Sequence, residues 1–138
     1  MVSTGEVLIA DDDAATCSLL AAIVLRRGLR PVVVTDGRRA VTLLSSHDYT
    51  AILLDLLMPE VSGVEVLAWL ASTKPEALRN VIVVTAAHES AWAACPEIAF
   101  IRGLHRKPFD LDQLIDAIDA CRDAQEERPG DQQPRKSR

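Results

Sequence analysis

The segment Ala51-Ile-Leu-Leu-Asp-Leu-Leu-Met-Pro59 joins four consecutive apolar residues to a single aspartate and a short loop that ends in proline. A short apolar run without polar alternation is typical of a strand buried on both faces. Apolar residues at helical spacing follow over 64–70, and a second fully apolar run occupies 81–84. The pattern predicts strand, loop, helix and strand, with Asp55 directly after the strand at 51–54.

The same unit repeats on both sides of this segment. Upstream, the pattern predicts two strands and two helices in alternation, at residues 6–10, 14–27, 31–35 and 38–46. Downstream, it predicts a strand near 100–106 and a final helix at 111–124. Five apolar strands alternating with five helices indicate an α/β fold, in which a doubly wound five-stranded parallel sheet is covered on both faces.

Length and composition favour one domain with a tail. The chain has 138 residues, of which 49% are hydrophobic, enough for one core. We therefore assign residues 1–124 to a single domain. Residues 125–138 hold no aliphatic or aromatic side chain but include Pro129, Gly130 and Pro134. A segment that cannot bury apolar surface is predicted to be a disordered tail.

Composition also limits location and partners. No apolar run is long enough to cross a bilayer, and residues 1–6 lack the features of a signal peptide. Cys17, Cys95 and Cys121 are odd in number and lack metal-ligand spacing, which favours buried thiols in a reducing compartment. The net charge is −5, without a basic stripe in the folded part. We expect a cytoplasmic protein that binds neither membranes nor DNA directly.

Polar residues interrupt the predicted strands at their carboxyl ends. Asp11 and Asp12 follow the first strand, and Asp55 follows the third. Thr85 ends the fourth strand and Lys107 the fifth. In open parallel sheets, ligands bind outside the carboxyl ends of the strands, where the strand order reverses. If the first and third strands flank that point, the three aspartates converge.

Three adjacent carboxylates repel each other and require a cation nearby. Carboxylate oxygens, a backbone carbonyl and waters are ligands that suit Mg²⁺. Lys107 adds a positive charge and Thr85 a hydroxyl donor, which completes the parts of a phosphoryl-transfer site. Asp55 has the least freedom of the three carboxylates and is predicted to be the nucleophile.

Each of these residues also has an ordinary structural explanation. Residues 11–13 are suited to cap a helix and Asp55 to cap a turn. Thr85 suits a strand, and Lys107 suits a protein surface. Their joint placement at one edge of the sheet is what favours a functional site.

Five motifs, in order along residues 7–124, resemble the receiver domain of two-component response regulators. They are the acidic pair at 11–12, Asp-Leu-Leu-Met-Pro at 55–59 with Gly63, Val-Val-Thr-Ala at 83–86, and Lys-Pro-Phe at 107–109. The separations between Asp55, Thr85 and Lys107 also match those of the family. The resemblance implies a flavodoxin-like fold with strand order 2-1-3-4-5.

The resemblance also implies roles for individual residues. Asp55 would accept the phosphoryl group, and Asp11 and Asp12 would organise Mg²⁺, for which Mn²⁺ would substitute. Leu57 would contribute its backbone carbonyl to the metal. Thr85 and Lys107 would contact the phosphoryl group. The proline after Lys107 would follow a cis peptide bond, whereas Asp13 falls at a variable family position and is predicted to cap the helix.

The partners implied by the resemblance are proteins. A histidine kinase or phosphotransfer protein would supply the phosphoryl group, and a downstream protein would read the altered surface. We expect a stand-alone receiver that acts by contact, because no effector segment follows Ala124. Such a protein is a switch and not an enzyme, with at most self-phosphorylation from small donors and slow autodephosphorylation. Phosphorylation-linked dimerisation is compatible with this description.

The sequence departs from the family pattern on the output side. The aromatic residue expected three positions before Lys107 is Leu104. His105 and Arg106 occupy a strand segment that is more apolar in the family, and Pro96 is expected to end the fourth helix early. We expect this output face to have diverged toward a specific partner.

Two other functions conflict with residues of this sequence, and a third stays open. A phosphatase that forms an aspartyl phosphate needs an acidic residue two positions after the nucleophile, where this chain has Leu57. A flavin protein needs phosphate donors after the first strand, where residues 11–13 repel phosphate. A phosphorylation-independent interaction module with a receiver fold is the remaining alternative.

Overall fold

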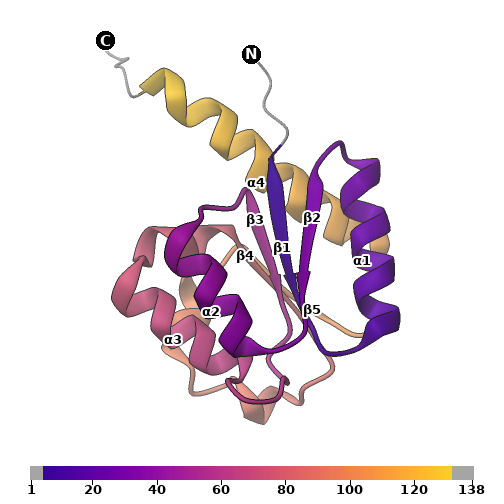
Figure 1. Ribbon diagram of the computed structural model, residues 1–138, viewed down its shortest axis with the longest axis vertical. Helices are drawn as coiled ribbons and strands as arrows, with labels where there is room; N and C mark the ends of the chain where they lie inside the picture. The colour runs from indigo at the N-terminus through magenta and orange to yellow at the C-terminus, as the bar shows by residue number, and fades with distance from the viewer. Residues whose placement is uncertain (1–4, 132–138) are drawn as a thin grey trace.

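The protein forms one five-stranded parallel sheet flanked by helices, as seen in a computed structural model that describes residues 5–131 (Figure 1). The order across the sheet is β2-β1-β3-β4-β5. The strands are β1 Glu6–Ala10, β2 Arg30–Val34, β3 Ala51–Leu54, β4 Val81–Thr85 and β5 Gly103–Arg106. The predicted α/β class, the parallel sheet and the strand order are confirmed.

The described residues also form four α-helices and three short 3-10 helices. The α-helices are α1 Ala14–Arg26, α2 Gly37–Ser46, α3 Gly63–Thr73 and α4 Leu111–Asp131. The 3-10 helices are η1 Pro75–Asn80, η2 Glu89–Ala91 and η3 Pro96–Phe100. No helix among the described residues is both long enough and apolar enough to cross a membrane.

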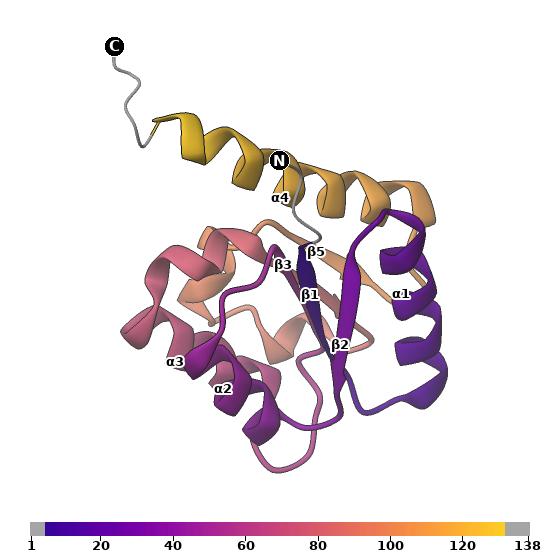
Figure 2. The same ribbon diagram turned by 45° about the horizontal axis from the view of Figure 1, so that its top comes forward.

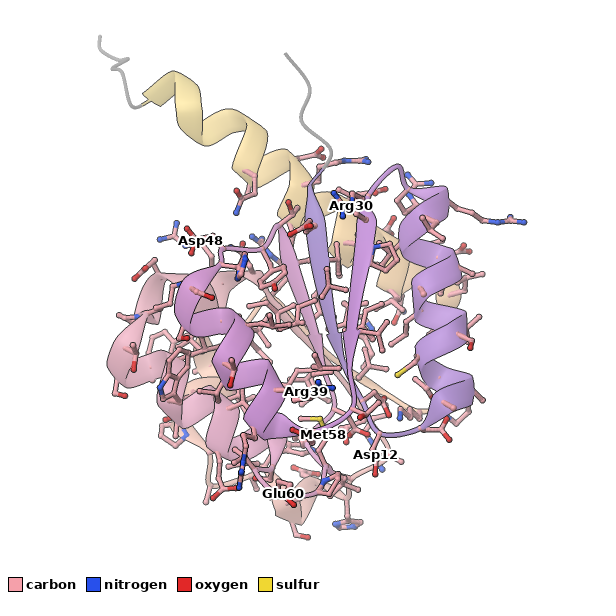
Figure 3. All side chains as sticks on the ribbon, in the orientation of Figure 1. Asp12, Arg30, Arg39, Asp48, Met58 and Glu60 are labelled. Carbon is pink, nitrogen blue, oxygen red and sulfur yellow. The ribbon has the colours of Figure 1, made fainter. Side chains whose placement is uncertain are left out.

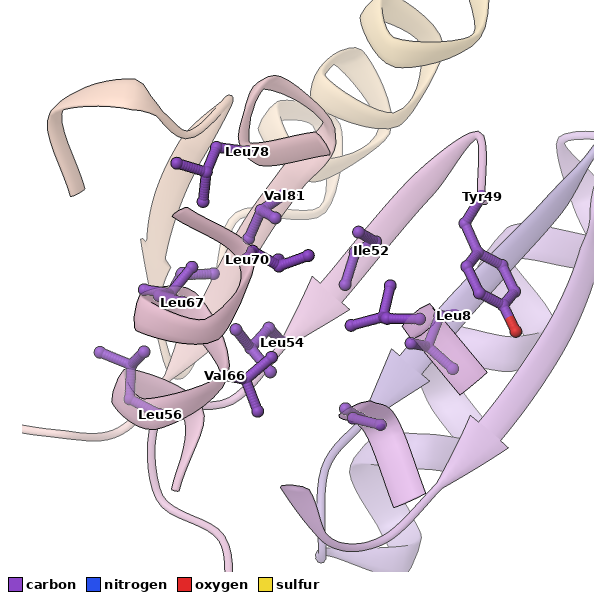
Figure 4. Close-up of a cluster of buried hydrophobic side chains, with 14 of the residues drawn as sticks. Leu8, Tyr49, Ile52, Leu54, Leu56, Val66, Leu67, Leu70, Leu78 and Val81 are labelled. Atoms are coloured by element: carbon purple, nitrogen blue, oxygen red, sulfur yellow. The ribbon is translucent and has the colours of Figure 1, made fainter. Parts of the chain in front are cut away.

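The sheet separates two apolar cores because successive strand residues face opposite sides. Leu8 and Leu54 face a first core beneath α2 and α3, shown in close-up in Figure 4. Val7 and Leu53 face a second core beneath α1 and α4. Figure 2 shows α2 and α3 on one side of the sheet and α1 on the other, with α4 running across the top of the view. Burial on both faces explains why the strands are apolar throughout.

Side-chain caps fix where the helices begin at the carboxyl edge of the sheet. Asp13 accepts a hydrogen bond from the Thr16 amide and caps α1. Asp36 caps α2 in the same way, and Ser62 forms a reciprocal capping box with Glu65 at the start of α3. Each helix therefore starts close to the strand end that precedes it.

The helix predicted between the fourth and fifth strands is present only as η2 and η3. Pro96 opens η3 and lacks the amide hydrogen that a continuous helix needs at that point. The predicted strand near 100–106 is correspondingly shorter, because η3 extends to Phe100. The connection between β4 and β5 is thus less regular than the other connections of the fold.

The last helix is longer than the predicted 111–124. Helix α4 continues to Asp131, beyond the end predicted at residue 124, while the division into a domain at 1–124 and a disordered tail at 125–138 stays a prediction. Glutamine, glutamate and arginine at 125–128 have high helix propensity, and the composition argument did not weigh this. The rest of the predicted tail, residues 132–138, lies outside the described residues.

Gly63 provides a test of how the β3–α3 loop is packed. A Cβ atom added at Gly63 would overlap the backbone of Asp55 and Leu56, so we expect Gly63→Ala to lower the free energy of unfolding by about 1–3 kcal/mol. The matched control is Gly103→Ala, where the nearest atom to an added Cβ, His105 Nε2, is 3.5 Å away. The free energy of unfolding of Gly103→Ala should stay within about 0.5 kcal/mol of the native value. Urea unfolding that gives equal losses for both variants would contradict this account.

Candidate functional site

The strand ends bring the predicted site residues together at one edge of the sheet. Asp11 follows β1 and Asp55 follows the adjacent strand β3. Thr85 is the last residue of β4, and Lys107 comes directly after β5. In Figure 3, Asp12 is labelled at this carboxyl edge, close to Met58 of the β3–α3 loop. The predicted convergence is therefore observed.

Three carboxylates form the centre of the site. One oxygen from each of Asp11, Asp12 and Asp55 lies within 4.8 Å of the others. Asp11 and Asp55 are only 1% and 5% exposed, whereas Asp12 is exposed. Two ionised groups with so little water around them require a positive charge close by.

Lys107 supplies a positive charge to both buried carboxylates. Its Nζ lies 2.9 Å from Asp11 Oδ2 and 3.3 Å from Asp55 Oδ2. Burial opposes the charged form of Lys107, but the hydrogen bond to Asp11 and the charges of both aspartates outweigh it, so the lysine pKa is raised. Burial raises the pKa of Asp11 despite the hydrogen bond from Lys107. One ammonium group therefore only partly compensates the two carboxylates.

Asp55 is also held by neutral donors. The Thr85 hydroxyl donates to Asp55 Oδ1 over 2.7 Å, and the Leu57 amide donates to the same oxygen over 3.1 Å. Thr85 Oγ1 in turn accepts a hydrogen bond from the Ala87 amide at 3.1 Å. Oδ1 is therefore anchored by two neutral donors, and Oδ2 faces the lysine.

An open cleft lies over this group of residues. Its lining includes Asp12, Asp55 and Lys107 together with Leu57 and Met58 from the β3–α3 loop. Leu57 is 52% exposed on the cleft wall. Its position is compatible with the predicted contribution of a carbonyl to a metal, which stays a prediction.

The acidic loop after β1 is tightly organised. Asp13 donates its amide to Asp11 Oδ1 over 2.8 Å, and its own carboxylate caps α1, as predicted. The Cys17 thiol donates to the Asp11 carbonyl over 3.1 Å. That carbonyl belongs to the peptide joining Asp11 to Asp12, so the thiol helps to orient both acidic residues. No sequence pattern indicates this contact, because a buried cysteine was expected only to fill space.

The lysine–proline peptide at 107–108 is cis, as the resemblance implied. Leu104, the predicted output position, is half-buried and packs against the first core. His105 is also half-buried, and burial lowers its pKa. The output role of Leu104 stays a prediction.

Replacing Lys107 by methionine tests its role as a counter-ion. The variant leaves the buried Asp11 carboxylate without its ammonium partner, so the metal-free protein should lose about 1–3 kcal/mol of unfolding free energy at neutral pH. Without Lys107, the Asp11 pKa should rise further above its ordinary value of 3.8. The deficit relative to the native protein should therefore shrink as the pH falls toward 3.8, because a protonated carboxyl needs no counter-ion. Urea unfolding at several pH values measures it.

Lys74→Met is the matched control at the opposite edge of the sheet. Lys74 lies 2.7 Å from the exposed carboxylate of Asp48, and this contact holds the pKa of Asp48 below its ordinary value. That stabilisation is present above pH 3.8 and is lost only as the pH falls through the lower folded value. The loss of unfolding free energy that Lys74→Met causes by removing this ion pair should therefore persist down to pH 3.8. A Lys107→Met deficit that behaves in the same way would contradict the assigned role.

Comparison with known proteins identifies the family. Residues 7–119 match the family model described as the response regulator receiver domain. The transcriptional regulatory protein TcrA of Mycobacterium tuberculosis is 32% identical over 118 residues, covering 83% of this chain and 44% of TcrA. The polar-differentiation response regulator DivK of Brucella ovis is 35% identical over 81 residues, covering 59% of this chain and 64% of DivK. The chain thus spans less than half the length of relatives such as TcrA.

Solved structures agree with this assignment. A CheY-like receiver domain from Methanospirillum hungatei has a TM-score of 0.80 at 21% identity, covering 91% of this chain and 99% of that structure. The receiver domain of the Francisella response regulator 1452 has a TM-score of 0.74 at 25% identity, with coverages of 88% and 98%. The response regulator TrrA of Thermotoga maritima, solved with Mg²⁺ and beryllofluoride, has a TM-score of 0.73 at 24% identity, with coverages of 85% and 98%. The chain belongs to the receiver domain family of two-component response regulators.

Proposed function

We propose that this chain is a phosphorylation-dependent switch that accepts a phosphoryl group on Asp55 with Mg²⁺ bound beside it. The observation that carries the proposal is the buried pair Asp11 and Asp55, which share the single ammonium group of Lys107. With Asp12 included, the cluster has three carboxylates for one lysine. This excess of negative charge favours a divalent cation.

The residues present fit magnesium. Asp11, Asp12 and Asp55 offer oxygen ligands that lie within 4.8 Å of one another, and the open cleft leaves room for water. A hard cation with oxygen ligands and retained waters is the expected occupant of such a site. The carbonyl of Leu57 would complete the protein ligands, and Mn²⁺ would substitute for Mg²⁺. The solved complex of TrrA with Mg²⁺ and beryllofluoride is a precedent in a protein of the same fold.

The chemistry proposed at Asp55 is nucleophilic displacement at phosphorus. A carboxylate oxygen of Asp55 forms a bond to phosphorus while the bond from phosphorus to the donor breaks, and the donor leaves with that electron pair. The bound metal would neutralise charge on the transferred oxygens. Lys107 would turn its ammonium group toward the same oxygens, and the Thr85 hydroxyl would donate to one of them. Both side chains already contact Asp55.

The phosphodonor that this chemistry requires carries a phosphoramidate or an acyl phosphate. A phosphohistidine of a histidine kinase or phosphotransfer protein is the first kind, and acetyl phosphate is the second. The output would be a surface that a downstream protein recognises, with a phosphorylation-linked homodimer as one form of such recognition. In this proposal the receiver domain acts in the cytoplasm, by contact with that downstream protein. Its only catalytic activities are self-phosphorylation and slow autodephosphorylation.

Intact-mass spectrometry after incubation with acetyl phosphate tests the proposal. We expect the native chain to gain the mass of one phosphoryl group when Mg²⁺ is present and to gain nothing when Mg²⁺ is replaced by a chelator. Asp55→Asn should gain nothing under either condition, because its amide is not a nucleophile. Hydroxylamine should remove the added group from the native chain, as expected for an acyl phosphate.

Asp48→Asn is the matched control, because it removes a carboxylate at the opposite edge of the sheet (Figure 3). It should be phosphorylated like the native chain. If the native chain, shown to be folded, gains no phosphoryl group under any condition, the proposal is overturned. The phosphorylation-independent interaction module then becomes the better description.

A further inference from the structure

The edge of the sheet opposite Asp55 contains a cavity that the proposed switch does not use. It opens between the end of α2, the start of β3 and the end of η1, with Gln125 of α4 in its wall, and we call it the amino-edge cavity. Asp48, another lining residue, is labelled in Figure 3 on the opposite side of the view from Asp12. The cavity has a volume of about 320 Å³. Pockets that bind small molecules start at about 300 Å³, so there is room for one small ligand.

Two polar side chains in the wall of this cavity are buried and lack a protein partner. Asn80 and Tyr49 are each only 6% exposed, and both line the cavity. Neither the Asn80 amide nor the Tyr49 hydroxyl makes a hydrogen bond with another described residue. Neither polar group is fully enclosed by protein, so each is open to this space. Buried polar groups are nearly always hydrogen-bonded, so the pair indicates a place where a ligand completes the hydrogen bonds.

The other buried polar residues show what is unusual about Asn80. Among the described residues, Asp11, Asp55 and Thr85 are also buried, and all three lie at the carboxyl edge. Each of them is hydrogen-bonded to another side chain there. Asn80 comes directly before β4, at the opposite end of that strand from Thr85. Burial of a polar side chain therefore marks a second place on this sheet, far from the first.

The charged side chains around the cavity do not suit an anion. The Lys74 ammonium group donates to the carbonyls of Leu44 and His47 over 2.9 and 3.1 Å. It also donates to Asp48 Oδ1 over 2.7 Å. An ammonium group has three donors, so none remains for a ligand. Glu76 also lines the cavity, is exposed, and adds a negative charge. The lining therefore disfavours a phosphate group.

The inner surface of the cavity suits a flat, neutral ring. Leu44 and Ile52, which are 1% and 2% exposed, form an apolar wall together with Ala77. The Asn80 amide presents a donor and an acceptor side by side, which is the pattern that pairs with the edge of adenine. A second hollow of about 350 Å³ shares three lining residues with the cavity and has room for a sugar.

We propose that the amino-edge cavity binds a neutral aromatic heterocycle whose edge carries a donor beside an acceptor. An adenine base, free or as a nucleoside, is the simplest molecule of this class. The Asn80 amide pairs with that edge, the apolar side chains cover the ring, and the charges of the lining disfavour nucleotides. The site does not depend on the proposed phosphorylation of Asp55, because it uses none of the residues at the carboxyl edge.

Proton–nitrogen NMR spectra of the full chain, recorded without Mg²⁺, test both binding and its location. Adenosine should bind with a Kd below about 1 mM and shift the amide signals of residues 47–52 and 74–80, leaving those of 11–13 and 55–57 unchanged. Purine riboside lacks the exocyclic amino group and should bind about fivefold more weakly or worse, because one hydrogen bond is lost. AMP should also bind more weakly than adenosine. Tighter binding of adenosine than of adenine would identify the nucleoside as the ligand, and equal binding the free base.

Asn80→Leu removes the amide and keeps a side chain of similar size. Because the amide has no hydrogen-bond partner among the described residues, the variant should fold with an unchanged or higher urea midpoint. Its affinity for adenosine should fall by about fivefold or more. Gln113→Leu removes an exposed amide of α4 outside the cavity, so it is the matched control and should bind like the native chain. Ala77→Leu fills the cavity without touching the amide and should also weaken binding.

Absence of shifts with both adenosine and adenine would overturn the proposal, and so would shifts centred on the carboxyl edge. Equal affinities for adenosine and purine riboside, or native affinity in folded Asn80→Leu, would overturn the role of the Asn80 amide. Tighter binding of AMP than of adenosine would overturn the assignment of a neutral ligand. Asp55→Asn should bind adenosine like the native chain, so a failure of the proposed phosphorylation leaves this test unaffected.

Discussion

The structure at the carboxyl edge of the sheet depends on the enclosure of two carboxylates, Asp11 and Asp55, around one ammonium group. Parallel strands β1 and β3 are adjacent, and each is followed directly by an aspartate, so the backbone itself brings the two charges together. Lys107 makes this tolerable without fully compensating it, since one positive charge faces two negative charges at 2.9 and 3.3 Å. A site built in this way retains affinity for further positive charge.

The rest of the fold keeps this arrangement rigid. The two apolar cores fix the strands from both faces, and caps start each helix at the edge where the carboxylates lie. Gly63 allows the β3–α3 loop to lie directly on the backbone of Asp55, and the Cys17 thiol holds the peptide between the two acidic residues. Preorganisation of this kind means that a ligand does not have to order the site when it binds.

Sequence patterns were sufficient to predict the strands and the residues at their ends, because these depend on regular spacing along the chain. Apolar runs identified the strands, and polar residues at their ends identified Asp55, Thr85 and Lys107, because strand ends in a parallel sheet share one edge. Patterns failed where competing local forces were close in strength. Pro96 divided an expected helix into short turns, and favourable helix propensity carried α4 beyond residue 124. The contact of the Cys17 thiol was not predictable, since it depends on how α1 is seated on the loop.

The Thr85 hydroxyl joins the buried carboxylates to the β4–β5 connection. It donates to Asp55 Oδ1 and accepts from the Ala87 amide, and Ala87 belongs to the first core. A ligand that took over the Thr85 hydroxyl would therefore act on the first residues of the β4–β5 connection. Short 3-10 helices make up much of that connection, so it has fewer backbone hydrogen bonds to resist a change than the long helices have.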